Sequence, residues 1–211
     1  MRTLAALQGI TEPRDRLAAA SGLLLGARYR RNPLGGGPGL PERGVVTLSF
    51  FDCVTYVESV AALALSKSPD DYRRHLMKLR YGARAPSWLN RLHYWSQWSD
   101  VHARRGIIRP VTPTRDTVRI RRSLSTIKSV PPAAVELVLH PWSSAIPEAD
   151  IVGFGSQRAD LDVFHVGILR RDRLRHASRR AGQVIEEPLA DFLTREQGSG
   201  LLLARLQGGE E

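Results

Sequence analysis

Cysteine is almost absent from this sequence, since Cys53 is the only one in 211 residues. A single cysteine excludes an intramolecular disulfide, so cysteine usage does not reveal the redox compartment. Long hydrophobic runs are also absent: no apolar stretch reaches the roughly 20 residues that a membrane-spanning helix needs, and no membrane span is predicted. The stretch Met1–Gly9 is too short and too soon interrupted for the core of a signal peptide, so no export signal is expected in this chain.

Lysine is also rare in this sequence. Only three of the 31 basic residues are lysine, and the net charge is +10. Arginine pairs recur along the whole chain, among them Arg30-Arg31 and Arg179-Arg180. Because the pairs are scattered and no nucleic-acid motif accompanies them, they predict a solvated basic surface and no specific nucleic-acid partner. Attraction to an anionic polymer such as a cell wall fits the same charge equally well.

The single cysteine stands where a helix should begin. Asp52 is a good N-cap residue, and the residues that follow contain no proline or glycine before Pro69. Apolar residues at helical spacing from Cys53 predict an inward face, whereas Glu58 is expected on the other side of the helix. The sequence therefore places the thiol in the first turn, at the top of a buried face.

That position suits a nucleophile. The positive end of the helix dipole favours the thiolate of Cys53 over the thiol. The first-turn N–H groups have no partners inside the helix and are free to stabilise an oxyanion beside the sulfur. The alternative is that Cys53 is a small buried hydrophobic residue without chemistry. The choice depends on whether the chain supplies a base.

Helices are expected in the first half of the chain and strands in the second. Caps and periodicity predict helices from Thr11 to Gly26, from Asp52, from Ser68 to about Arg80 and from about Trp88 to Arg105, with a glycine-rich flap at Gly35–Gly39. After residue 106, closely spaced short apolar segments predict strands, and Pro188–Arg195 predicts one more helix. The links are too short for crossovers, so we expect an α+β fold with a mostly antiparallel sheet: one domain over 1–211, helical over 1–106 and strand-rich over 107–211.

The strand-rich half supplies a candidate base. Alternation along 162–169 places His165 on one face of a strand, with Gly167 leaving room beside the imidazole. The next strand carries His176. If the turn between them has two or four residues, both imidazoles lie on the same side of the hairpin. A capped cysteine and two such histidines form the pattern of nucleophile (Cys53), base (His165) and orienting residue (His176).

No metal or organic cofactor is predicted. The other four histidines show no metal-ligand spacing, and one cysteine without a histidine cluster argues against a zinc site. The aromatic stretch from Trp88 to Trp98 fits a core helix, but Arg91 and His93 among its rings also suit a sugar or peptide groove.

The sequence resembles the DUF1460 family of NlpC/P60-type cysteine amidases. The resemblance covers about residues 20–203 and is carried by several motifs in order: Phe51-Asp52-Cys53-Val54-Thr55-Tyr56-Val57-Glu58, Leu79-Arg80-Tyr81, Arg91-Leu92-His93-Tyr94-Trp95 with Trp98, His165-Val166-Gly167-Ile168 and His176-Ala177-Ser178.

This resemblance implies a papain-like fold in which the cysteine helix packs on a small antiparallel sheet from the C-terminal half. It implies cleavage of the amide between N-acetylmuramic acid and L-alanine in peptidoglycan fragments, with anhydro-muropeptide ends among the expected substrates. Cys53, His165 and His176 match its catalytic set, and members are commonly exported to the cell envelope. Four further positions match residues expected to border or contact the substrate: Tyr29, Arg91, His93 and Tyr94.

Some positions depart from the pattern, and two other functions stay open. Asn90 stands where a serine is expected, and Ala149-Asp150 replaces a usual Gly-Asp. One alternative is an endopeptidase that cuts within the stem peptide, as in the wider superfamily. The other is a basic wall- or polyanion-binding module with an inert thiol. The oligomeric state is left open by the sequence.

Overall fold

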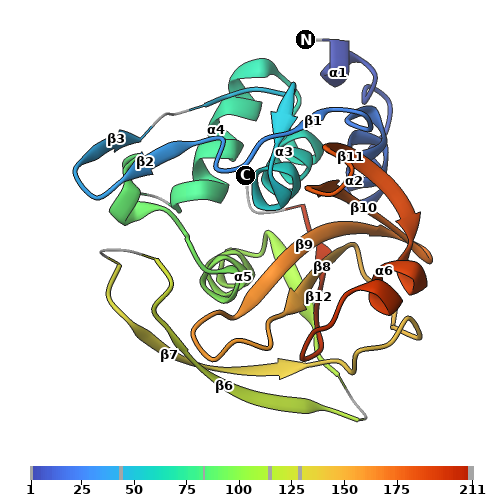
Figure 1. The fold of residues 1–211 in the computed structure, drawn as a ribbon. Coiled ribbons are helices and arrows are strands. Elements are labelled where there is room, and N and C mark those ends of the chain that lie inside the picture. The colour runs from blue at the N-terminus through green and yellow to red at the C-terminus, as the bar shows by residue number, and fades with distance from the viewer. Residues whose placement is uncertain (1, 43–44, 83, 114–115, 128–129, 209–211) are drawn as a thin grey trace.

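The computed structural model describes residues 2–42, 45–82, 84–113, 116–127 and 130–208, so Met1 of the predicted N-terminal stretch lies outside it (Figure 1). The helices are α1 (Arg2–Ala5), α2 (Pro13–Leu23), α3 (Cys53–Leu65), α4 (Pro69–Tyr81), α5 (Trp95–Arg104), α6 (Leu189–Arg195) and the 3-10 turn η1 (Trp88–Asn90). The strands are β1 (Arg28–Tyr29), β2 (Gly35–Gly37), β3 (Leu40–Glu42), β4 (Phe50–Phe51), β5 (Ile108–Val111), β6 (Val118–Leu124), β7 (Ala133–Leu139), β8 (Ile151–Gly155), β9 (Val163–Arg170), β10 (Arg173–Ser178), β11 (Gln183–Pro188) and β12 (Leu201–Leu206). The predicted α+β class, with helices before most strands, is confirmed.

The main sheet is larger than the small antiparallel sheet that the sequence suggested. It has eight strands in the order β4-β1-β11-β10-β9-β8-β12-β5. The six strands from the C-terminal half pair antiparallel. Two short strands of the helical half extend one edge, and β1 runs parallel to β4 with Arg28 opposite Phe50. The sheet is therefore mixed, because the segment before the cysteine helix joins it.

Two hairpins stand outside the main sheet. The glycine segment that the sequence predicted as a flap forms the β2–β3 hairpin, and β6 pairs with β7 in a second hairpin at the lower edge of Figure 1. Gly36 has φ +72°, and a Cβ there would lie 2.3 Å from Glu42 Oε2. The left-handed backbone and the close carboxylate explain why this position of β2 needs glycine.

The predicted helix from Trp88 to Arg105 is broken. Ser87 caps the short turn η1, Arg91 has extended backbone angles, and α5 begins only at Trp95. The Arg91 side chain turns back to Glu42 and donates from Nε to its carboxylate at 2.8 Å. This ion pair ties the break to the β2–β3 hairpin, a long-range contact that local helix propensity does not include.

Helix α3 begins at Cys53 as predicted, but it is buried on every side. Asp52 accepts a hydrogen bond from the Thr55 N–H, and the Thr55 hydroxyl completes a capping box. The expectation that Glu58 lies on an outward face is wrong, because α4 packs there. Glu58 accepts from Arg80 Nε at 3.0 Å, and both side chains are 2% exposed. Burial raises the pKa of Glu58 to about 7 in spite of Arg80.

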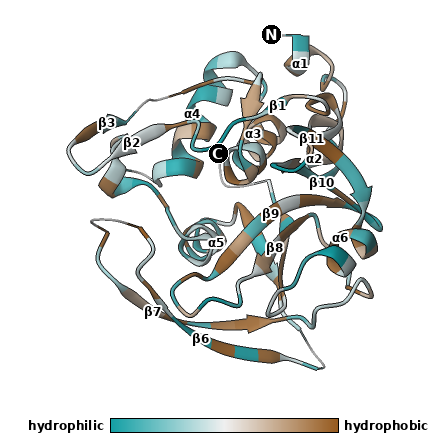
Figure 2. Ribbon diagram, viewed as in Figure 1, coloured by the Kyte–Doolittle hydropathy of each residue, from teal (hydrophilic) through white to brown (hydrophobic). Residues whose placement is uncertain are grey.

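The sheet separates two apolar cores. The larger core lies on the face that α2, α3 and α5 cover and includes Val166 and Ile168 of β9. The smaller core lies on the α6 face and includes Phe154 and Phe192. Figure 2 shows β9 largely in hydrophobic colours, whereas α4 carries many hydrophilic residues. No helix in the described ranges is long and apolar enough to cross a membrane.

Candidate active site

Cys53 occupies the first position of α3 and is half-buried. Burial and the neighbouring Asp52 carboxylate raise the pKa of its thiol to about 12, although hydrogen bonds from the backbone N–H groups of Val166, Val54 and Cys53 itself act to lower it. The helix tip therefore supplies the expected N–H donors, but they do not outweigh desolvation. Although the helix tip favours the thiolate, Cys53 is a thiol in the free protein at neutral pH.

The sulfur lies where two central strands separate. The β9–β10 ladder ends at the pair Ile168–Arg175, although β9 continues to pair with β8 and β10 with β11. Beyond that point the N–H of Val166 lies close enough to the Cys53 sulfur to lower the pKa of the thiol. The tip of α3 thus reaches the backbone of β9 one residue away from His165.

The two imidazoles meet as the hairpin register predicted. Arg170 pairs with Arg173, which leaves a two-residue turn. His165 Nε2 and His176 Nδ1 are 2.7 Å apart, and the two rings are perpendicular at 89°. A Cβ at Gly167 would lie 3.3 Å from the His176 Cβ and 2.5 Å from a Leu174 methyl carbon. Glycine therefore leaves the space in which the imidazoles pack, as the sequence indicated.

Two further charged residues extend the histidine pair, and the sequence reasoning did not identify them. The His176 Nε2 is 2.9 Å from Oε1 of Glu187, on β11. Arg195 of α6 donates to both oxygens of the same carboxylate, at 2.7 and 2.9 Å. The only local signal was an acidic residue at the end of a strand beside the one that carries His176. Pairing of β10 with β11 was needed to bring them together.

The hydrogen bonds among Glu187, His176 and His165 determine which nitrogen of each imidazole carries the proton. Burial acts to raise the pKa of Glu187, but hydrogen bonds from Arg195 and His176 prevail and lower it, so the group is an ionised acceptor at neutral pH. His176 Nε2 must then donate to Glu187, and in neutral His176 the Nδ1 must accept. His165 Nε2 therefore donates to His176, which leaves the lone pair on His165 Nδ1. The geometry prepares that nitrogen to accept a proton.

Both imidazoles are neutral in the free protein. Burial lowers the pKa of His165 to about 3, with the neighbouring His176 and Arg195 adding to the effect. Burial also lowers the pKa of His176, although Glu187 opposes it. The site thus rests as a thiol and a neutral imidazole. An unprotonated imidazole is the form that a general base requires.

His165 and His176 are hydrogen-bonded to each other, whereas in the described part of the chain neither imidazole is hydrogen-bonded to the Cys53 sulfur. Both rings point to the α6 face, where His165 stacks on Phe192 with ring centroids 5.4 Å apart, whereas α3 packs on the other face. Among the described residues no hydrogen bond joins the Cys53 sulfur to either imidazole. Such contacts are often long in free enzymes and shorten with substrate.

The four other predicted residues surround the helix tip in different ways. Tyr29 is half-buried; burial raises the pKa of its hydroxyl, and the neighbouring Cys53 and Asp52 add to the effect. Arg91 and His93 line a pocket of about 230 Å³ together with residues of the α3 start. His93 Nε2 donates to the Trp88 carbonyl at 2.6 Å.

Tyr94 is placed differently, because its side chain is only 1% exposed. Its hydroxyl accepts a hydrogen bond from the Ile127 N–H at 3.2 Å. In this structure Tyr94 therefore supports the wall behind the pocket.

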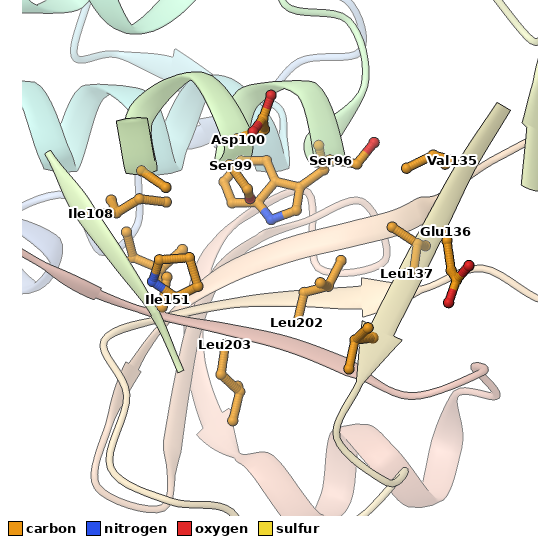
Figure 3. Close-up of a pocket in the computed structure, with 15 residues that line it drawn as sticks. Ser96, Ser99, Asp100, Ile108, Val135, Glu136, Leu137, Ile151, Leu202 and Leu203 are labelled. Atoms are coloured by element: carbon orange, nitrogen blue, oxygen red, sulfur yellow. The ribbon is translucent and has the colours of Figure 1, made fainter. Parts of the chain in front are cut away.

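A second pocket, of about 550 Å³, is lined by His165 and His176 together with Phe164 and Phe192. An apolar pocket of about 370 Å³ lies elsewhere, between α5 and the strands β7 and β12 (Figure 3). Its labelled lining includes Ser96, Ser99, Leu137 and Leu202 and none of the predicted site residues. Within the described chain no cluster of histidine, cysteine and carboxylate side chains could hold a metal ion.

Solved structures from Bacteroides and Legionella species share this fold. An N-acetylmuramoyl-L-alanine amidase from Bacteroides uniformis ATCC 8492 superposes with a TM-score of 0.81 at 23% identity, covering 92% of this chain and 99% of that one. A putative xylanase from Bacteroides fragilis gives 0.75 at 23% identity, covering 89% and 99%. A DUF1460 protein from Legionella pneumophila str. Philadelphia 1 gives 0.82 at 19% identity, covering 99% and 93%. At these identities the similarity establishes the fold.

The family relationship comes from the sequence itself. No curated protein matches the chain. A model of the AmiA-like family, described as N-acetylmuramoyl-L-alanine amidase-like, matches residues 19–129 and 117–200, which include Cys53, His165 and His176. These matches span most of the chain, and the protein belongs to the N-acetylmuramoyl-L-alanine amidase-like family.

Proposed function

We propose that this protein is a cysteine amidase that hydrolyses the N-acetylmuramoyl–L-alanine bond of peptidoglycan fragments, anhydro-muropeptides included. In this proposal Cys53 is the nucleophile, His165 the base and His176 the third polar member, on an NlpC/P60-type papain-like fold in one domain. Family membership supports the reaction class. The observation that carries the residue assignment is the hydrogen-bonded order Arg195, Glu187, His176, His165, which leaves His165 Nδ1 unprotonated one residue from the contact between Val166 and Cys53.

The first half-reaction forms a thioester. The Cys53 sulfur attacks the lactyl carbonyl carbon of the muramic acid, and its proton passes to His165 Nδ1 during the attack. First-turn N–H groups of α3 stabilise the negative charge on the carbonyl oxygen. The carbon–nitrogen bond then breaks, and His165 returns the proton to the departing L-alanine amine.

The second half-reaction releases the sugar acid. Water attacks the thioester while His165 Nδ1 accepts one of its protons, the carbon–sulfur bond breaks, and the proton returns to the sulfur. Glu187 and Arg195 hold His176 so that His165 keeps the same free nitrogen in both halves. No step requires a metal or organic cofactor.

The test is mass spectrometry of defined muropeptides incubated with the wild-type protein and with Cys53→Ala. The amidase releases a free peptide that begins at L-alanine together with the intact sugar acid, and Cys53→Ala releases neither. Full activity in Cys53→Ala would contradict the assignment of the nucleophile. Products that keep L-alanine on the sugar would instead identify a stem-peptide endopeptidase.

A non-catalytic polyanion-binding module is the remaining alternative. Thiol labelling separates it from the amidase, because an inert buried Cys53 reacts at the same slow rate whether or not His165 is present. In the amidase, His165→Ala slows labelling near pH 7, since the base that removes the thiol proton is gone.

A further inference from the structure

The pocket above the two imidazoles carries unpaired positive charge. Its rim includes Arg179 and Arg180, which follow β10 and lie in the turn to β11. Both side chains are exposed, and within the described residues neither guanidinium forms an ion pair. The other charged members are Arg195, held by Glu187, and Glu196, whose carboxylate lies 3.5 Å from Arg195. The rim is therefore net positive even when the acidic side chains are counted.

This turn is fastened to the region of the candidate nucleophile. The Tyr29 N–H donates to the Gly182 carbonyl at 2.7 Å, which joins β1 to the same turn. Arg179 lies close enough to Tyr29 to lower the pKa of its hydroxyl against the larger effect of burial, and Tyr29 is itself a neighbour of Cys53. The turn that carries the two exposed guanidinium groups is thus joined to β1, whose Tyr29 neighbours Cys53.

The sides of the pocket suit a peptide with carboxylates. Half-buried Phe164 offers part of its ring surface for aliphatic parts of a ligand, and guanidinium groups bind carboxylates through paired N–H donors. In a muropeptide the only carboxyl group of the muramic acid is consumed in the scissile amide. Every free carboxylate of the substrate is therefore on the peptide.

We propose that Arg179 and Arg180 form a carboxylate-binding subsite for the departing peptide, so that the enzyme selects muropeptides whose stem peptide carries free carboxylates. The inference rests on the proposed amidase function for the identity of the peptide. It assigns the pocket above His165 and His176 to the peptide side of the scissile bond, and it assigns substrate preference to the turn between β10 and β11.

The experiment measures binding, so that it does not depend on hydrolysis. The Cys53→Ala protein is titrated calorimetrically with N-acetylmuramoyl-L-alanyl-D-glutamate and with its diamide, in which both carboxylates are carboxamides. Both ligands are used in the reducing and 1,6-anhydro forms. Two guanidinium–carboxylate pairs at a partly exposed pocket predict roughly tenfold tighter binding of the diacid. The preference declines as the salt concentration rises.

Two double variants locate the preference. Arg179→Gln with Arg180→Gln should make the diacid and the diamide bind about equally. Arg170→Gln with Arg171→Gln removes the same charge from the exposed turn between β9 and β10 and should leave the preference unchanged. Equal loss in both double variants would show general attraction by net charge and overturn the subsite. Equal binding of the two ligands by the Cys53→Ala protein, or no binding of either, would also overturn it.

A wrong amidase proposal would give a different set of results from a wrong subsite proposal. In that case the mass of the cleaved products is wrong while the diacid preference and its loss in the Arg179 and Arg180 variant persist.

Discussion

Glu187→Gln is the substitution that tests the proton assignment most directly. The carboxylate receives hydrogen bonds from His176 Nε2 at 2.9 Å and from both terminal nitrogens of Arg195. Glutamine keeps the shape but is neutral, and its NH2 group cannot accept from Arg195. The side chain still offers one oxygen, so His176 keeps a weaker acceptor and the productive tautomer is less strongly favoured.

The magnitude follows from the strength of that bond. A hydrogen bond to a charged group contributes about 1.5–3 kcal/mol and a neutral one about 0.5–1.5 kcal/mol. The difference, about 1–1.5 kcal/mol, corresponds to roughly a tenfold fall in kcat/KM. Glu187→Leu removes the acceptor entirely and should cost about a hundredfold on the same scale.

The pH profile separates a positioning role from a structural one. Glu187 acts to raise the pKa of His176, so its neutralisation should move the acid limb of kcat/KM to lower pH. Glu186→Gln is the matched control, because it makes the same change one residue earlier on β11, where the carboxylate pairs with Arg175 on the other face. Equal effects of the two glutamine variants, or an acid limb that does not move, would refute the reasoning.

Three further predictions concern packing and burial. Gly167→Ala places a methyl group 2.5 Å from a Leu174 methyl carbon and 3.3 Å from the His176 Cβ. It should lower the free energy of unfolding in urea by about 1–3 kcal/mol, and it should lower kcat while changing KM less. A wild-type kcat would contradict this prediction. Glu58→Ala leaves Arg80 charged and unpaired in the core and should cost about 3–5 kcal/mol, whereas Glu58→Met with Arg80→Met should cost less. His102 is fully buried, and burial lowers its pKa to about 4, so folding excludes a proton that the unfolded chain binds below about pH 6.5. Stability should therefore fall as the pH drops from 6.5 towards 4, and His102→Gln should recover about 2 kcal/mol of the loss at pH 5; an unchanged slope would contradict the assignment.

Local sequence signals determined the elements that carry the predicted groups. Asp52 and Thr55 cap α3 through short-range hydrogen bonds, so the position of Cys53 in the first turn follows from neighbouring residues. His165 and His176 lie on the same face of the sheet because side chains alternate along a strand and the turn between the two strands has two residues. Alternation and turn length depend only on residues within one hairpin. The family motifs sit on these same elements, which is why they were recognisable from the sequence.

Only the tertiary structure decided what surrounds them. Local periodicity placed Glu58 outward, and packing of α4 buried it against Arg80. Propensity predicted one helix across Arg91, but the backbone is extended there and Arg91 pairs with Glu42, 49 residues away in the chain. Pairing of β10 with β11 brought Glu187 to His176 and α6 brought Arg195 to Glu187, so the chain that fixes the imidazole protons depends on distant contacts. The sequence by itself determined which residues could react, because caps and turns act over a few residues. Their protonation states were decided by burial and charge from segments far along the chain, which no local pattern encodes.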